Sequence, residues 1–273
     1  MHRRFAVLGV SVALLAVSAW ADNGNGNSNG NGNGCNSLPS YNQLKAALVA
    51  ATNAESSGLN MNMWGTIVDR DGIVCAIAFT GTDRGGQWPG SRVISAQKAN
   101  TANAFSLDAS AVSNGNGLAL ALSTANLYSA VQPGGSLYGL QASNPVDTGN
   151  AYQGPSSNFG TSNDPLVGSK VGGVNVFGGG LALYDSQHQI VGAVGVSGDT
   201  SCADHFIAWR TRHNLNLDHL AGAIGGVSGD TARPDNIIFD ITTNIYGISS
   251  SAGGFGHPRC INTGDASLLP AVQ

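Results

Sequence analysis

The segment GAVGVSGDTSCADH, residues 192–205, places side chains capable of chemistry directly after a glycine-rich bend. We expect His205 in the first turn of a helix, where the helix dipole disfavours an imidazolium and leaves a neutral ring that can bind a metal ion or accept a proton. Trp209 and Arg212 follow at i+4 and i+7, on one stripe of that helix. A flat aromatic ligand with anionic groups would suit this stripe. The alternative is a partly buried histidine packed on tryptophan.

The rest of the bend has a structural explanation. Ser201 and Asp204 form a Ser-x-x-Asp helix start, in which the carboxylate lies near the free N–H groups of the first turn. The glycines fit close packing and a turn with positive φ. His205 is therefore the residue that we assign to function. Asp204 and His205 could instead be the acid–base pair of an enzyme, although adjacent residues on a helix point about 100° apart.

Three further residues are candidates for binding a ligand. His257, in GFGHPRC, is a second candidate metal ligand. Arg84 and Lys98 are cations that could hold an anionic group such as a propionate, and the alternative for Arg84 is an ion pair with Asp83. The motif GVSGD, which contains Ser197, is not the G-x-S-x-G elbow of hydrolases, and the glycine runs lack G-x-G-x-x-G spacing. A serine hydrolase and a dinucleotide-binding domain therefore have little support.

The N-terminal residues are typical of an export signal. Arg3 and Arg4 precede an apolar run at residues 5–17 and the small-x-small pattern AWA at 19–21. We interpret residues 1–21 as a cleaved signal peptide of a periplasmic or secreted protein and expect no membrane span after it. Its removal takes the formal net charge from −4 to −6, because two arginines and no acidic residues are lost. A mildly acidic chain without a basic cluster is a poor candidate for binding nucleic acid.

Four cysteines follow the predicted signal peptide, and an even number in an oxidising compartment indicates two disulfides. Three connectivities are possible. As a working hypothesis we pair Cys35 with Cys260, which would tie the ends of the domain together, and Cys75 with Cys202, which would join a strand to a helix start. Free thiols or metal ligands are the alternative. No C-x-x-C motif occurs, so a zinc ribbon and covalent haem attachment lack their usual signature.

Hydrophobic periodicity predicts the elements that position these residues. The predicted helices cover about residues 40–57, 91–105 with Ser91 as the cap, 117–131 and 201–213. The predicted strands cover 64–69 and 73–79 around an Asp-Gly turn, then GGLALYD and QIVGAVGVSG as a second hairpin. The segment NIIFDITTNIYGI could supply one or two more strands. This order does not fit a Rossmann domain and predicts an α+β domain with an antiparallel sheet.

Composition divides the chain further. Residues 22–37 are rich in asparagine and glycine and are expected to be a flexible linker. The domain proper covers 38–213. Within it, 132–177 is a long loop insertion with little periodicity, which we interpret as a lid or an assembly surface. Residues 214–273 form a C-terminal extension expected to pack on the domain.

Three segments carry a resemblance to a known family: DRDGIVCAIAFTG, SAQKANTANAFS and GGLALYDSQHQIVGAVGVSGDTSCADH. Together with the helix that follows, they resemble the GlcG/HbpS-like family of haem-binding proteins over residues 38–213. The resemblance implies a profilin-like or roadblock-like α/β sandwich, assembly into homo-oligomers, and non-covalent haem binding with a role in storage, sensing or degradation.

The resemblance also implies a haem site. Its metal ligand would be His205, with His257 as the other candidate, because the first predicted helix has no histidine to take this role. The residues assigned to the haem-binding site are His205, Asp204, Trp209, Arg212, Lys98, Arg84 and His257. Two alternatives stay open: an enzyme acting on a small organic acid or corrinoid, and a ligand-free secreted interaction or scaffold protein.

Overall fold

The first helix and the two hairpins lie where the sequence predicts them. The structure, a computed structural model, describes residues 33–113 and 118–273. Helix α1 spans Tyr41–Asn53, and strands β1 to β4 span Trp64–Asp69, Val74–Phe79, Gly180–Tyr184 and Ile190–Ser197. The predicted signal peptide and most of the predicted linker lie outside the described residues, but Asn33–Ser37, at the end of that linker, form a 3₁₀ turn.

The four strands form one antiparallel sheet in the order β2-β1-β4-β3. Its central strands β1 and β4 pair from Trp64 opposite Ser197 to Asp69 opposite Gly192. Two local hairpins therefore join into one sheet through strands that are far apart in the sequence. The predicted α+β class, an antiparallel sheet with flanking helices, is confirmed.

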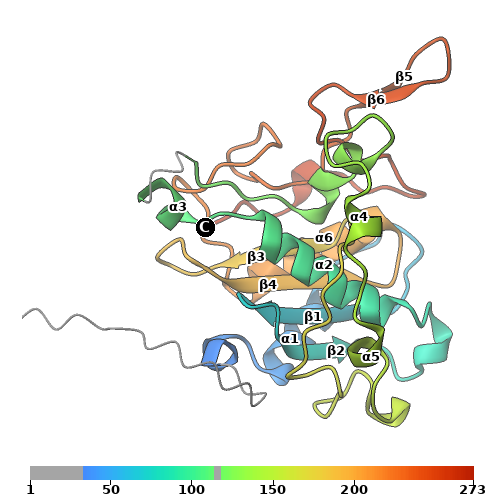
Figure 1. Cartoon of the computed structure of the whole chain (residues 1–273), viewed down its shortest axis with the longest axis vertical. Coiled ribbons are helices and arrows are strands. Elements are labelled where there is room, and N and C mark those ends of the chain that lie inside the picture. Colours follow the sequence, from blue (N-terminus) through green and yellow to red (C-terminus); the bar gives the residue numbers. More distant parts are fainter. Residues whose placement is uncertain (1–32, 114–117) are drawn as a thin grey trace, which may run out of the picture.

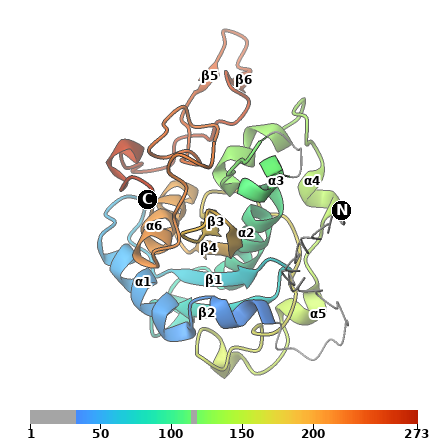
Figure 2. The ribbon, with the colours of Figure 1, turned by 90° about the vertical axis from the view of Figure 1, so that its left-hand side faces the viewer.

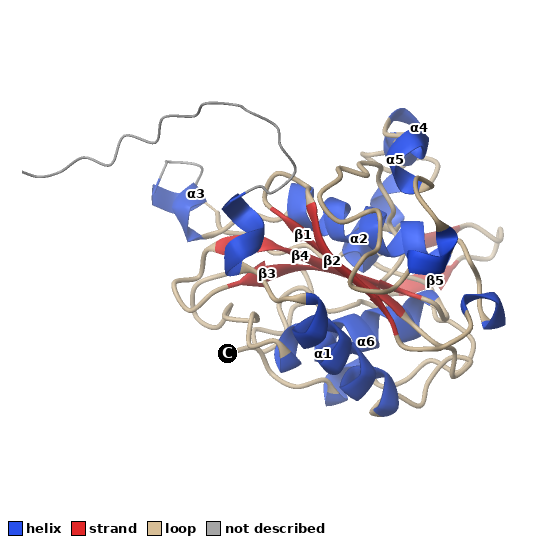
Figure 3. Ribbon diagram, turned by 90° about the horizontal axis from the view of Figure 1, so that it is seen from below, coloured by secondary structure: helices blue, strands red, loops and turns tan. Residues whose placement is uncertain are grey.

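Helices cover both faces of this sheet. Helix α2, Ser91–Phe105, lies on one face, and α1 and α6, Ser201–Asn214, lie on the other (Figure 3). Along β1, Trp64 and Val68 belong to the apolar cluster under α2, whereas Ile67 belongs to the cluster shared with α1 and α6. Because both faces are buried, the strands are nearly continuous apolar runs.

Helix α2 lies unusually close to the sheet at a pair of glycines. Gly195 of β4 is opposite Gly180 of β3. A Cβ atom on Gly195 would lie 1.9 Å from the carbonyl oxygen of Ser95, and one on Gly180 would lie 2.4 Å from that of Lys98. The absence of side chains at these positions brings Lys98 of α2 against the end of β4.

The predicted helix at 117–131 is wrong in its described part. Thr124–Leu127 and Ser129–Val131 form two short 3₁₀ turns instead. Ser123 begins the first turn in a capping box with Asn126, whose side-chain oxygen accepts from the Ser123 N–H at 2.9 Å. The apolar spacing reflects burial of Leu122, Leu127 and Val131 in a small cluster under the loops.

Two helix caps differ from the prediction by one residue. Helix α2 begins at Ser91, so Gly90 is its N-cap. At α6 the N-cap is Thr200, whose Oγ accepts from the Ala203 N–H at 3.3 Å. Ser201 is therefore the first helical residue, and its hydroxyl is free for other partners.

The loop insertion and the C-terminal extension both pack on the domain through buried ion pairs. Arg92 of α2 donates to Asp164 of the insertion, with Nε 2.9 Å from Oδ2. Arg212 of α6 pairs with Asp235 of the extension.

The short helices α3, α4 and α5 span Ala109–Ser113, Leu140–Ser143 and Thr148–Ala151. Strands β5, Ile241–Thr243, and β6, Ser249–Ser251, form a hairpin that projects from the body of the molecule (Figure 1 and Figure 2).

Two disulfides are present, but the pairing that we hypothesised is wrong. Cys35 is bonded to Cys75 and Cys202 to Cys260. The first bond ties the turn at Asn33–Ser37 to β2, and the second ties the start of α6 to the C-terminal extension. The pairing depends on which segments meet across the sheet and helix α6, which the cysteine spacing does not specify.

Within the described ranges, no helix has the length and apolar character needed to cross a membrane.

Candidate functional site

A cavity of about 200 Å³ lies where β4 ends and α6 begins, at the bend that the sequence singled out. Apolar side chains of Trp88, Ile94 and Phe177 line part of it. Its polar lining residues are Ser91, Lys98, Ser197, Asp199, Ser201 and Asp204. Gly198, at the bend itself, has a φ of 158°, which a residue with a side chain rarely adopts. The bend is therefore both a strand-to-helix turn and one wall of a cavity.

Lys98 and Asp204, both predicted site residues, form a buried ion pair in this wall. Lys98 Nζ lies 2.6 Å from Asp204 Oδ2 and donates to the Val196 carbonyl at 3.0 Å. Asp204 Oδ1 also accepts from the Asp199 N–H at 2.9 Å. Burial raises the pKa of Asp204 to about 6, against the opposing effect of the Lys98 charge, and burial lowers the pKa of Lys98. Each charged group has a partner, so the pair has a structural role whether or not a ligand binds.

His205 lies in the core, away from the cavity lining. Its ring is fully buried, and Nε2 accepts from the Ile237 N–H at 3.1 Å and lies 3.2 Å from Asn236 Oδ1. Nδ1 has no hydrogen-bond partner among the described residues. Burial lowers the pKa of His205 to about 3, so the ring is neutral at physiological pH. His205 and Asp204 thus have separate partners and do not form a pair.

The predicted stripe of α6 packs against the C-terminal extension. The ring centroids of His205 and Trp209 are 6.0 Å apart, and the Arg212 guanidinium lies 4.6 Å above the Trp209 ring. Arg212 donates to both oxygens of Asp235, at 2.6 and 2.9 Å, and both side chains are fully buried. The stripe therefore agrees with the simpler interpretation, in which a buried histidine packs on tryptophan. Asp235 neutralises the charge of Arg212.

Arg84 is not brought to the bend. It is an exposed residue whose guanidinium lies 5.6 Å from the Phe159 ring centroid. Asp83 caps the following turn by accepting from the Gly85 N–H at 2.8 Å, and the two residues form no ion pair in the described structure. Arg84 lines a separate cavity with Trp64 and Phe159.

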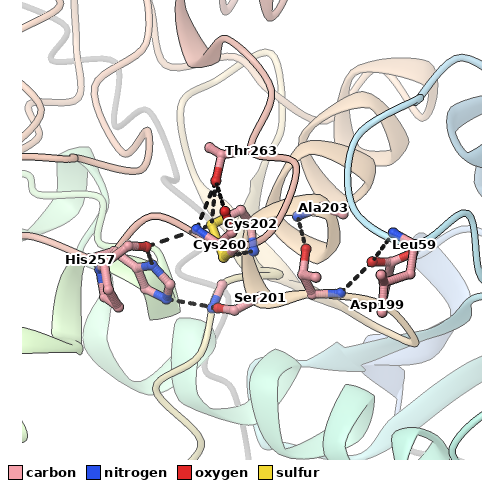
Figure 4. Close-up of a disulfide and its surroundings, with 11 residues drawn as sticks. Leu59, Asp199, Ser201, Cys202, Ala203, His257, Cys260 and Thr263 are labelled. Atoms are coloured by element: carbon pink, nitrogen blue, oxygen red, sulfur yellow. Dashed lines mark hydrogen bonds between the residues drawn. A yellow bond between two sulfur atoms is a disulfide. The ribbon is translucent and has the colours of Figure 1, made fainter.

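The predicted residue His257 meets a serine that the sequence analysis did not connect with it. His257 Nε2 lies 2.8 Å from Ser201 Oγ, and Nδ1 lies 2.7 Å from the Pro258 carbonyl oxygen (Figure 4). A carbonyl can only accept, so Nδ1 carries the proton and Nε2 presents its lone pair to Ser201. Burial lowers the pKa of His257 to about 4. The cysteines are the sequence signal that could have indicated this contact, because Cys202 follows Ser201 and Cys260 lies three residues after His257.

A larger groove, of about 620 Å³, is lined by Pro258, the residue that follows His257. One wall is the segment 128–135, and the other comes from the β5–β6 hairpin and Pro258. Tyr128 lines this groove, and its ring centroid lies 4.9 Å from that of His257. Its hydroxyl makes no hydrogen bond among the described residues. Tyr128 lies within the helix predicted at residues 117–131, and no motif in the sequence singled it out.

Comparison with known proteins identifies the family. Solved structures that resemble the chain include the following two. The first, Klebsiella pneumoniae protein ORFY, has 26% identity, covers 64% of this chain and 86% of its own, and has a TM-score of 0.40. The second, described as a PduOC:heme complex, has 23% identity, covers 64% of this chain and 91% of its own, and has a TM-score of 0.40. No curated protein matches. The family model "Haem degrading protein HbpS-like" matches residues 41–211, and the chain therefore belongs to the HbpS-like family of haem degrading proteins.

Proposed function

We propose that the protein binds haem non-covalently in the groove between Tyr128 and the β5–β6 hairpin. Membership of the HbpS-like family supports haem as the ligand. The observation that carries the location is Tyr128, because its hydroxyl faces no partner in the described structure and it lines a groove of about 620 Å³. Pockets for ligands of this class typically enclose ~300–1,000 Å³.

The residues of the groove fit a porphyrin. Ile241, Ile248, Pro133 and Pro258 supply apolar wall, and a tyrosine oxygen is one of the axial ligands that haem iron takes in proteins. When bound, haem would supply the redox and oxygen chemistry of its iron, while Tyr128 would hold the metal. His257, packed against the Tyr128 ring, would fix the orientation of that ring.

The two predicted histidine ligands stay predictions, but the geometry favours Tyr128 over both. His205 is enclosed and already accepts from the Ile237 N–H. His257 Nε2 is engaged with Ser201. Of the predicted cations, Lys98 and Arg212 are each paired with a buried aspartate, and Arg84 lines a separate cavity. We assign the propionates to Arg259, an exposed residue next to Pro258 that makes no ion pair in the described part of the chain.

Export and assembly belong to the same proposal. Two disulfides are typical of an oxidising compartment, which supports a periplasmic or secreted protein. Assembly into a homo-oligomer, and a role in haem storage, sensing or degradation, remain part of what the family resemblance implies. The alternative acid–base pair is not advanced, because Asp204 and His205 have separate partners.

A hemin titration followed in the Soret region tests the proposal. We expect a saturable shift for the wild-type chain, and for Tyr128→Phe a weaker affinity with loss of the charge-transfer band that phenolate ligation produces. His205→Gln keeps a hydrogen-bond acceptor for the Ile237 N–H and should bind as the wild type does. The matched control is His188→Asn, at a β-turn position with φ of 59° that asparagine tolerates. A non-saturating wild-type response, or full binding by Tyr128→Phe, would contradict the proposal.

A further inference from the structure

Ser201 and His257 have the relative positions of a nucleophile and its general base. The Ser201 hydroxyl lies 2.8 Å from His257 Nε2, within the hydrogen-bond reach that such a pair needs. The Gly178 N–H donates to the same oxygen at 2.7 Å. Because Nδ1 carries the imidazole proton, Nε2 can only accept, and the Ser201 hydroxyl donates to it. The Pro258 carbonyl orients the imidazole in the way that the third member of a catalytic triad does.

The pair is fixed by covalent structure. The Cys202–Cys260 disulfide links the residue after Ser201 to the residue three positions beyond His257 (Figure 4). The Cys202 N–H donates to Cys260 Sγ at 3.1 Å, and Thr263 Oγ1 accepts from the Cys260 N–H at 2.7 Å. These bonds hold the loop of His257 against the first turn of α6. They therefore limit the distance over which the imidazole can move from Ser201.

Ser201 also faces space for a substrate. It lines the cavity of about 200 Å³ together with Trp88, Ile94 and Phe177. At ~30 Å³ for each water-sized group, this volume holds about six such groups. As the first residue of α6, Ser201 has a backbone N–H that finds no acceptor among the described residues. That N–H, at the positive end of the helix dipole, can donate to a developing oxyanion.

We propose that Ser201 and His257 form an acyl-transfer site for small carboxylic esters, with the acyl group in the cavity lined by Trp88, Ile94 and Phe177. The proposal does not depend on haem, because this cavity and the Tyr128 groove share no lining residue. It also differs from the hydrolase motif rejected in the sequence, which concerned Ser197.

The reaction balances with water as the co-reactant. Ser201 Oγ attacks the ester carbonyl carbon while its proton passes to His257 Nε2. The carbon–oxygen bond to the alcohol then breaks, and the alcohol leaves with the proton from Nε2. Water attacks the resulting acyl-serine, giving its proton to Nε2, and the carboxylic acid is released as that proton returns to Ser201. Neither a metal ion nor a redox partner takes part.

The electrostatics predict slow chemistry. Burial lowers the pKa of His257 to about 4, with a contribution from the nearby Lys98 charge. The ring is therefore neutral and able to accept a proton at pH 7, but it is a weak base. Formation of one covalent adduct per chain is a more sensitive measurement than steady-state turnover.

The test is labelling of the full chain with a fluorophosphonate probe, in which Ser201 Oγ bonds to phosphorus and fluoride leaves. We expect one adduct, located at Ser201 by peptide mass spectrometry. Ser201→Ala should abolish it, and His257→Gln, which keeps an amide near Ser201, should slow it by at least tenfold, since general-base catalysis contributes ~10²-fold or more. Ser186→Ala, at the exposed β3–β4 turn, is the control that should label at the wild-type rate.

Circular dichroism and thermal unfolding of each variant separate loss of chemistry from loss of fold. The proposal is refuted by an unlabelled wild-type chain, by equal labelling in Ser201→Ala, or by wild-type rates in folded His257→Gln. Hemin binding measured on the same variants distinguishes the two proposals. Ser201→Ala should keep the Soret shift, and Tyr128→Phe should keep the probe adduct.

Discussion

Removing the Cys202–Cys260 disulfide should separate the stability of the fold from the geometry of the Ser201–His257 pair. The disulfide closes a loop with a sequence separation of 58, and Cys35–Cys75 closes one of 40. In the chain-entropy model, the stabilisation depends on the logarithm of loop length, and both loops yield about 4 kcal/mol at 25 °C. The double variants Cys202→Ala/Cys260→Ala and Cys35→Ala/Cys75→Ala are therefore matched in expected stability.

The two double variants differ in their expected effect on the Ser201–His257 pair. Loss of Cys202–Cys260 frees the loop that carries His257, whereas Cys35 and Cys75 connect a turn to β2 on another part of the sheet. We expect both double variants to lose a similar free energy of unfolding, measured by guanidinium titration with tryptophan fluorescence. Labelling of Ser201 by the fluorophosphonate should slow by at least tenfold in the Cys202/Cys260 variant and remain unchanged in the Cys35/Cys75 variant. Equal labelling rates in the two folded variants would refute the role that we give to this disulfide.

Two further predictions concern buried charge. Lys98→Met leaves the Asp204 carboxylate buried without its cation, which should lower the free energy of unfolding by ~3–5 kcal/mol. The control Lys170→Met, at an exposed position, should have little effect. Denaturant titration of both variants measures the difference. Stability should also fall in acid, because the pKa of His205 is lowered to about 3 and the ring must charge on unfolding. The pKa of His205 in the folded chain lies below the unfolded value of 6.5. The stability that the neutral, buried ring contributes is therefore fully present above pH 6.5. It is lost at ~1.4 kcal/mol per pH unit as the pH falls towards 3. Unfolding titrations at pH 7 and pH 4 should show a smaller loss for His205→Gln than for the wild type, and an identical loss in both would contradict the calculation.

Local patterns in the sequence predict most of the domain. The Asp-Gly turn between β1 and β2, the apolar runs of β3 and β4, and the periodicity of α1 and α2 each depend on residues within one turn or one strand length. The prediction of a helix at 117–131 was wrong because local hydrogen bonds compete with the helical pattern. Its apolar residues are spaced for burial, but Ser123 and Asn126 satisfy backbone groups in a tighter turn.

The candidate site was predicted in part. The bend and the residues Lys98 and Asp204 were singled out in the sequence, and the structure places both side chains in the wall of one cavity. Their assignment to haem binding stays a prediction. His205 was emphasised because its position at a helix start is visible in the sequence. Whether that helix turns the ring towards a cavity or into the core depends on the C-terminal extension, and Ile237 and Asn236 of that extension enclose it.

The sequence alone therefore determined the family, the α+β class and the strand-to-helix bend, because these depend on local propensity and on motifs that are contiguous in the chain. The tertiary structure decided the disulfide pairing, the burial of His205 and the meeting of Ser201 with His257. Those features join segments far apart in the chain, and their geometry follows from how α6, the sheet and the C-terminal extension share one core. No local pattern specifies such a contact, because its stability comes from packing that exists after the chain has folded.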